Sequence, residues 1–208
     1  MKNQLLIMLE MQDAMNARVN PEWRQANNAW YRAIWTECAE MLDHYGWKWW
    51  KHQQPDLDQV RLELVDIFHF AMSDYLLGGT DNNEVAERIL SELSEPASAM
   101  DIREAIESMA QSTIDRKSMH FSEFSNVMQL IDMDFSQLYR LYVGKNVLNF
   151  FRQDHGYQDG SYTKNWQGRE DNEHLTELLG KLDSESDSFQ DNIYQGLKRR
   201  YAGQVGVN

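Results

Sequence analysis

The stretch DQVRLELVDIFHFAMSDYLL, residues 58–77, decides the fold class of this chain, because apolar side chains occupy nearly every side of one long segment. A helix that is apolar all round is a buried helix. Asp56 follows Pro55 and is a suitable N-cap residue, and Gly78 with Gly79 supplies a C-terminal stop. We therefore predict a central buried helix over residues 57–77.

The remaining segments also show helical spacing, and neither a period-two strand pattern nor a repeat of fixed length is found. We predict an all-α protein, a multi-helix bundle organised as a single domain over residues 1–208. Within it, residues 81–134 form a possible acidic helical insertion or subdomain. The other expected helices cover residues 3–18, 22–45, 82–93, 99–115, 121–130, 134–154, 170–182 and 187–200.

Composition limits the possible partners. The 208 residues carry 20 Lys and Arg against 33 Asp and Glu, a net charge of −13, so we expect no binding to nucleic acid or to an anionic membrane. The single cysteine, Cys38, excludes an intramolecular disulfide and a Cys-rich zinc site. No apolar run is long enough for a transmembrane helix or a signal-peptide core. These features predict a cytoplasmic protein.

Charge is unevenly distributed along the chain. Residues 81–134 contain 4 basic and 12 acidic side chains, whereas residues 140–169 contain 5 basic and 2 acidic ones. The basic segment is explained either by a local anion site or by ordinary scatter of charge on solvated helices.

Four carboxylates lie where apolar residues are expected. Glu37 shares an apolar helical face with Ile34, and Glu40 follows it by three residues. Glu63 and Asp66, again three residues apart, interrupt the buried central helix. Carboxylates are rarely buried without a partner or a metal. Their mutual repulsion also raises their pKa values unless a cation lies between them.

Carboxylate oxygens favour magnesium or manganese over zinc, so the four residues predict a Mg²⁺ site, with Mn²⁺ as a possible substitute. A di-iron bundle is the rival interpretation, but it requires Glu-x-x-His on two helices, and only Asp66-x-x-His69 has a comparable spacing. His69 is either a hydrogen-bonded core residue or part of the site. The pairs Glu84-x-x-Glu87 and Glu104-x-x-Glu107 are expected to be surface residues.

Three blocks of the sequence resemble one known family. They are MLEMQDAMN (residues 8–16), ECAEMLDHYGWKWWK with ELVDIFHF (37–51 and 63–70), and GKNVLNFFRQDHGYQDGSYTKNWQGREDN (144–172). Together, and in this order, they resemble the dimeric all-α dUTP diphosphatases. That resemblance implies a homodimeric catalytic domain of the all-α NTP pyrophosphohydrolase type, which hydrolyses dUTP, and also dUDP, to dUMP with magnesium.

The resemblance also implies roles for individual residues. Metal ligands would be Glu37, Glu40, Glu63 and Asp66, and Glu37 would also orient the attacking water. Phosphate contacts would come from Lys145, Arg152, Lys164, Asn172 and the neighbouring Arg169. Contacts to the base or sugar would come from Gln12, Asn16, Trp49, His69, Asn149 and Tyr157.

Elementary chemistry agrees with these implied roles. Phosphoanhydride hydrolysis needs neutralised charge and an in-line water more than covalent catalysis, and no P-loop motif offers another phosphate site. The glycines at 156, 160 and 168 would let a loop approach a phosphate closely. Two alternatives remain: a related all-α pyrophosphohydrolase with another base preference, such as dCTP, and a non-catalytic acidic helical adaptor.

Overall fold

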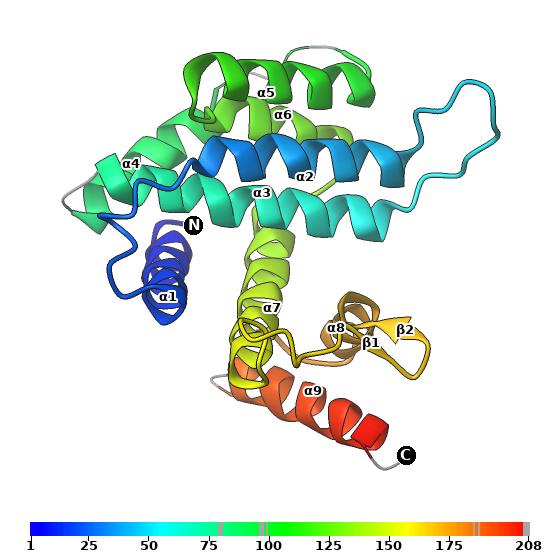
Figure 1. Ribbon diagram of the computed structural model, residues 1–208. Helices are drawn as coiled ribbons and strands as arrows, with labels where there is room; N and C mark the ends of the chain where they lie inside the picture. Colours follow the sequence, from blue (N-terminus) through cyan, green and yellow to red (C-terminus); the bar gives the residue numbers. More distant parts are fainter. Residues whose placement is uncertain (79–80, 96–97, 99, 185, 187, 206–208) are drawn as a thin grey trace. The chain divides into compact units, whose positions relative to one another are not determined.

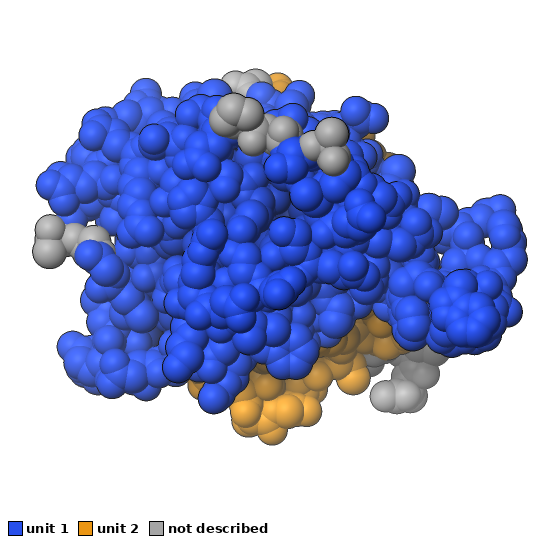
Figure 2. All heavy atoms as spheres, turned by 90° about the horizontal axis from the view of Figure 1, so that it is seen from above, with its two compact units in different colours: residues 1–139 blue, residues 140–208 orange. Residues whose placement is uncertain are grey.

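The computed structural model describes residues 1–78, 81–95, 98, 100–184, 186 and 188–205. The chain divides into two compact units: unit 1, residues 1–139, and unit 2, residues 140–208 (Figure 2). Whether the two act as a single domain stays a prediction of the sequence.

The all-α prediction is confirmed. Over the described residues, the secondary structure consists of nine helices and one two-stranded hairpin. Their bounds are α1 Lys2–Val19, α2 Trp30–Tyr45, α3 Leu57–Gly78, α4 Asn82–Leu93, α5 Ile102–Arg116, α6 Phe121–Leu130, α7 Phe135–Asp154, β1 Asn165–Trp166, β2 Arg169–Glu170, α8 Asp171–Leu179 and α9 Phe189–Val205.

Unit 1 is built on α2 and α3, which lie side by side and run in opposite directions (Figure 1). Most of α3 is buried, as its apolar sequence predicts. Phe68 of α3 packs against Phe121 and Phe124 of α6, with ring centroids 5.5 and 5.3 Å apart. α4 packs on α1 and α5 on α2, and α4, α5 and α6 all contribute buried apolar side chains to unit 1. Because α3 is enclosed in this way, its buried polar residues Glu63, His69 and Ser73 face other side chains.

One predicted helix begins too early. Residues 22–29 were expected to form the first part of the helix that continues into α2. Instead residues 22–27 form turns, residues 28 and 29 are irregular, and α2 begins at Trp30. Asn27 takes a φ of 51°, a left-handed conformation that a continuous helix cannot contain. Trp23 in this turn is nonetheless buried, and its ring lies 6.2 Å from that of Trp30. The spacing of Trp23 and Trp30 therefore reflects a turn packed against a helix rather than one continuous helix.

Other predicted helix ends are close to the observed ones. The expected start at residue 99 lies outside the described residues, as does the expected start at residue 187. The first described helical residues are Ile102 in α5 and Phe189 in α9. Gly79, expected in the stop signal of the central helix, also lies outside them.

Unit 2 contains the larger part of α7, the hairpin, α8 and α9. Its aromatic core joins three of these elements: the Phe151 ring of α7 lies 5.8 Å from that of Trp166 in β1 and 5.5 Å from that of Tyr201 in α9. The hairpin was not predicted from the sequence. Its two strands are only two residues long, too short to show a period-two pattern.

Candidate active site

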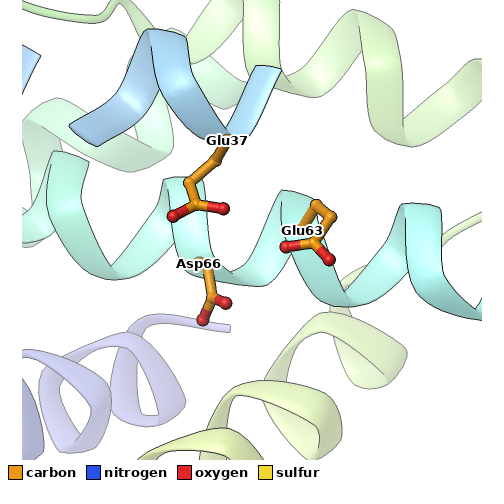
Figure 3. Close-up of side chains that lie close together, drawn as sticks. All are labelled: Glu37, Glu63 and Asp66. Carbon is orange, nitrogen blue, oxygen red and sulfur yellow. The ribbon is translucent and has the colours of Figure 1, made fainter. Parts of the chain in front are cut away.

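Three of the four predicted metal ligands come together in unit 1. Glu37 projects from α2, and Glu63 and Asp66 project from neighbouring turns of α3 (Figure 3). Their ligand oxygens all lie within 4.8 Å of one another. Glu63 is buried and the other two are half-buried. The antiparallel packing of α2 on α3 therefore brings together carboxylates that are 26 to 29 residues apart in sequence.

The electrostatics of this cluster are unfavourable for a group of anions alone. Burial raises the pKa of Glu37 from its usual 4.5 to about 8, and the negative charges of Asp66, Glu63 and Glu40 contribute to the same shift. His44, whose Nε2 lies 3.4 Å from a carboxylate oxygen of Glu63, is a neighbouring partner. A cation between the carboxylates would relieve this repulsion.

Glu40 occupies a different position from the other three. It lies one turn beyond Glu37 on α2, is exposed, and does not belong to the group of three that meets within 4.8 Å. Its charge still contributes to the raised pKa of Glu37, so it lies near the cluster. The control pairs on α4 and α5, Glu84-x-x-Glu87 and Glu104-x-x-Glu107, are exposed as predicted.

The donor set fits a hard divalent cation. It offers carboxylate oxygens from two rigid helices, and such oxygens suit Mg²⁺ or Mn²⁺ better than zinc. Side chains positioned by packed helices also hold their geometry better than side chains on loops.

A buried polar cluster joins α1 to α3. Gln12 and Asn16 of α1 are buried, and the Gln12 Nε2 donates to Asn16 Oδ1 at 3.0 Å. Both amides also reach Ser73 of α3, and Gln12 Oε1 lies 2.6 Å from His69 Nδ1. The expected base-contacting residues Gln12, Asn16 and His69 are thus brought together in one network. A solvated helix face, the alternative for the two amides, does not fit their burial.

Ser73 was missed by sequence reasoning. It lies in the middle of the buried α3, four residues after His69. A serine at a fully buried helical position is a usable signal, because a buried hydroxyl needs hydrogen-bond partners. The sequence could not show that these partners lie on α1.

Trp49 stands apart from this network. It is 90% exposed in the loop between α2 and α3, and its ring lies 5.3 Å from that of Trp50. Residues of this loop and Arg103 of α5 line an open pocket of about 420 Å³. Of the six residues expected to contact base or sugar, Trp49 is therefore the most open to solvent.

Unit 2 places three predicted phosphate residues in a paired arrangement, in which Lys145 and Arg152 are buried and Asn172 is half-buried. Arg152 makes a bidentate contact with Asp171, Nε to Oδ2 at 2.9 Å and Nη2 to Oδ1 at 2.8 Å, and also donates to Asn149. Lys145, only 2% exposed, donates to Asn172 Oδ1 at 3.0 Å.

Asp171 organises this arrangement. Tyr162 donates a hydrogen bond to it at 2.8 Å, in addition to the two from Arg152. Burial by itself would raise the pKa of Asp171, but the hydrogen bonds and charge of Arg152 outweigh that effect and hold the pKa below its usual value. Sequence reasoning missed Asp171, although an acid at the start of a helix among several bases is a detectable signal.

The last three predicted residues of this region lie nearer the surface. Arg169 bonds to Glu177 at 3.0 Å, and Tyr157 is exposed. Lys164 is exposed, lies 5.8 Å from the Tyr157 ring centroid, and has no ion pair among the described residues. The glycines at 156, 160 and 168 all adopt positive φ, which fits their predicted role in a tight loop.

Fold and site together define an all-α protein with a carboxylate cluster on an antiparallel helix pair, whose oxygens could hold a metal ion. A family model described as dUTPase matches residues 4–157, which is most of the chain and includes the carboxylate cluster and the α1–α3 amide network. The chain belongs to the dUTPase family, and it is an enzyme, a dUTP diphosphatase that hydrolyses phosphoanhydride bonds.

A search among curated protein sequences finds no match to this chain. The family match ends at residue 157, so Lys164, Arg169 and Asn172 lie beyond it, and their phosphate roles rest on the sequence resemblance alone. Membership of an enzyme family argues against the non-catalytic adaptor.

Proposed function

We propose that the enzyme hydrolyses dUTP, and also dUDP, to dUMP with Mg²⁺, which Mn²⁺ can replace. This reaction keeps uracil out of DNA and supplies dUMP. The observation that carries the proposal is the meeting of Glu37, Glu63 and Asp66 on paired helices in a member of the dUTPase family.

The carboxylates would hold the cation, with Glu40 beside them. Bound Mg²⁺ supplies positive charge that neutralises phosphate oxygens and makes water more acidic. Glu37 has a second role as the general base: its carboxylate oxygen orients the attacking water and accepts its proton. The family resemblance suggests this role, and the central place of Glu37 among acidic neighbours supports it.

The α1–α3 amide network is the proposed base site. Gln12, Asn16 and His69 present hydrogen-bonding groups from a buried position, which favours a base edge over water. Trp49, Asn149 and Tyr157 are proposed as further contacts to base or sugar. Because Trp49 is largely exposed, it can bind the base or sugar only if the substrate contacts the loop between α2 and α3.

Lys145, Arg152, Lys164, Arg169 and Asn172 are the proposed phosphate contacts. Arg152 and Lys145 are already paired within unit 2, so we assign them mainly a holding role. Lys164 is exposed and without an ion pair among the described residues, so it is more accessible to a phosphate than the buried Lys145 and Arg152.

One assay tests the proposed reaction. Release of dUMP is measured from dUTP, dUDP, dTTP and dCTP, each with Mg²⁺, with Mn²⁺ and after removal of metal by EDTA. We expect strong preference for the uracil nucleotides and loss of turnover in EDTA. A preference for dCTP would instead support the related pyrophosphohydrolase reading.

We also propose that the enzyme is a cytoplasmic homodimer. Trp47, Trp49 and Trp50 are 43%, 90% and 57% exposed, which is unusual for a cluster of aromatic side chains and fits an interface. Light scattering at micromolar concentration should give the mass of two chains. An active species with the mass of one chain would contradict this proposal.

No helix among the described residues combines the length and apolar character needed to cross a membrane.

A further inference from the structure

Ser73 lies at the centre of the α1–α3 amide network. Its side chain is fully buried, and its Oγ lies 3.0 Å from Gln12 Nε2, 2.9 Å from Asn16 Nδ2 and 2.9 Å from the carbonyl oxygen of His69. A hydroxyl has one proton to donate and two lone pairs to accept with. These three contacts therefore use its full hydrogen-bonding capacity.

The direction of each bond follows from the carbonyl. The His69 carbonyl can only accept, so the Ser73 proton must point to it. The Ser73 oxygen must then accept from both side-chain amides, and both must present their nitrogen to it. Ser73 thereby fixes the orientation of Gln12 and Asn16, because turning either amide over would place its oxygen against the serine oxygen.

The same direction is transmitted to the histidine. With its nitrogen on Ser73, Gln12 turns its Oε1 to His69 Nδ1, 2.6 Å away. An amide oxygen cannot donate, so Nδ1 carries the proton, and in the neutral ring Nε2 carries the lone pair. One serine thus sets the polarity of two amides and one imidazole.

We propose that Ser73 is a positioning residue that makes the base site select uracil over cytosine. This inference rests on the proposed role of Gln12, Asn16 and His69 as base contacts. Uracil offers a donor at N3 and an acceptor at O4, whereas cytosine has an acceptor at N3 and a donor at N4. A site whose amides are held in one orientation matches only one of these two hydrogen-bonding patterns. The base with the other pattern would place donor against donor and acceptor against acceptor in a buried site.

Removal of the serine hydroxyl should release this constraint. In Ser73→Ala, Gln12 and Asn16 can turn over together, because the bond between them and the contact to His69 can both re-form with donor and acceptor exchanged. We therefore expect dCTP to become a better substrate and dUTP a poorer one. The readout is the ratio of kcat/KM for dUTP to that for dCTP. We expect this ratio to fall about tenfold or more, the usual consequence of losing one buried hydrogen bond. Ser73→Thr, which keeps the hydroxyl, should recover part of it.

Ser125 supplies the matched control. It is also a buried serine of unit 1, and its hydroxyl donates to the Leu93 carbonyl at 2.9 Å, as Ser73 does to His69, but it belongs to no base-contacting network. Ser125→Ala should leave the dUTP to dCTP ratio unchanged. Thermal unfolding of each variant reports the loss of stability separately from the change in selectivity.

The outcomes separate this inference from the proposed function. If Gln12→Ala keeps wild-type handling of dUTP, the base site itself is wrong. If Gln12→Ala impairs dUTP turnover but Ser73→Ala leaves the ratio unchanged, only the role of Ser73 is wrong. If Ser73→Ala does not fold, Ser73→Cys repeats the test with a weak acceptor. Failure of both to fold would assign Ser73 a purely structural role and overturn the proposal.

Discussion

Buried acidic groups have opposite surroundings in the two units. In unit 1, burial and neighbouring carboxylates raise the pKa of Glu37 to about 8. In unit 2, Arg152 and Tyr162 bond to Asp171 and hold its pKa below the usual value despite its burial. Burial and like charge thus disfavour the ionised form of Glu37 in unit 1, whereas the carboxylate of Asp171 is stabilised in its ionised form by its own neighbours. The first arrangement is typical of a binding site, the second of a structural support.

Removing one carboxylate of the unit 1 cluster should give the largest effect. Glu63→Gln preserves shape but removes a charged ligand, and we expect kcat/KM for dUTP to fall roughly 10³-fold, as when an electrostatic catalytic contact is lost. In EDTA the same variant should unfold at a higher temperature than wild type, because repulsion within the cluster decreases.

The control for this variant is Glu107→Gln, an exposed glutamate of α5 outside the cluster. It should alter neither turnover nor the melting temperature in EDTA. Wild-type turnover in Glu63→Gln would show that the carboxylate cluster of unit 1 is not needed for activity.

Breaking the unit 2 pair should mainly reduce stability. Asp171→Ala leaves the buried Arg152 guanidinium without its carboxylate, a change that costs about 3 kcal/mol or more. Urea unfolding followed by tryptophan fluorescence measures this. Glu177→Ala, which removes an exposed partner of Arg169 and Arg200, should cost much less, because solvent screens surface ion pairs. Equal costs would show that burial of the Asp171 pair has no consequence.

The pH dependence of this loss has a definite sign. The pKa of Asp171 is lower in the folded than in the unfolded chain. Its contribution is therefore fully present above its unfolded pKa, near 3.8, and is lost as pH falls through the lower folded value. The stability difference between wild type and Asp171→Asn should shrink as urea titrations move from pH 6 towards pH 3. A difference independent of pH would contradict this.

A smaller effect on kinetics is expected for an exposed residue of unit 2 that is proposed to contact phosphate directly. Lys164→Ala should raise KM for dUTP about tenfold, because a charge-assisted phosphate contact is lost, while the melting temperature stays near the wild-type value. Lys181→Ala, an exposed lysine nearby in sequence, is the control and should change neither. Equal kinetics for the two variants would place Lys164 among ordinary surface charges.

Helical periodicity was sufficient to predict most of the fold. The buried helix over residues 57–77 is observed as α3, since its apolar character is local and needs no tertiary information. The helix predicted over residues 22–29 was wrong. The spacing of the aromatic residues favoured a helix there, but Asn27 adopts a left-handed conformation, which ends a helix.

The candidate site could be predicted only in part. Paired spacing on apolar faces pointed to Glu37, Glu63 and Asp66, because buried charge is conspicuous in a sequence. That spacing did not distinguish Glu40 from the other three carboxylates, although Glu40 lies on the exposed side of α2. Ser73 was missed because its amide partners lie 57 and 61 residues away. No local pattern encodes such a contact.

The hairpin of unit 2 gives the smallest expected effect. β1 and β2 are joined by Gln167 and Gly168, whose φ values of 53° and 81° are the positive values that a two-residue type I′ turn requires. Gly168→Ala should therefore lower the free energy of unfolding by about 1 kcal/mol, because alanine is strained at positive φ. Gly180, at φ −61° after α8, is the matched control. A Cβ there meets nothing closer than 3.6 Å, so Gly180→Ala should be neutral or stabilising. Equal urea midpoints for the two variants would mean that the hairpin adds nothing to the stability of unit 2, and that Asp171 and its partners hold this unit without it.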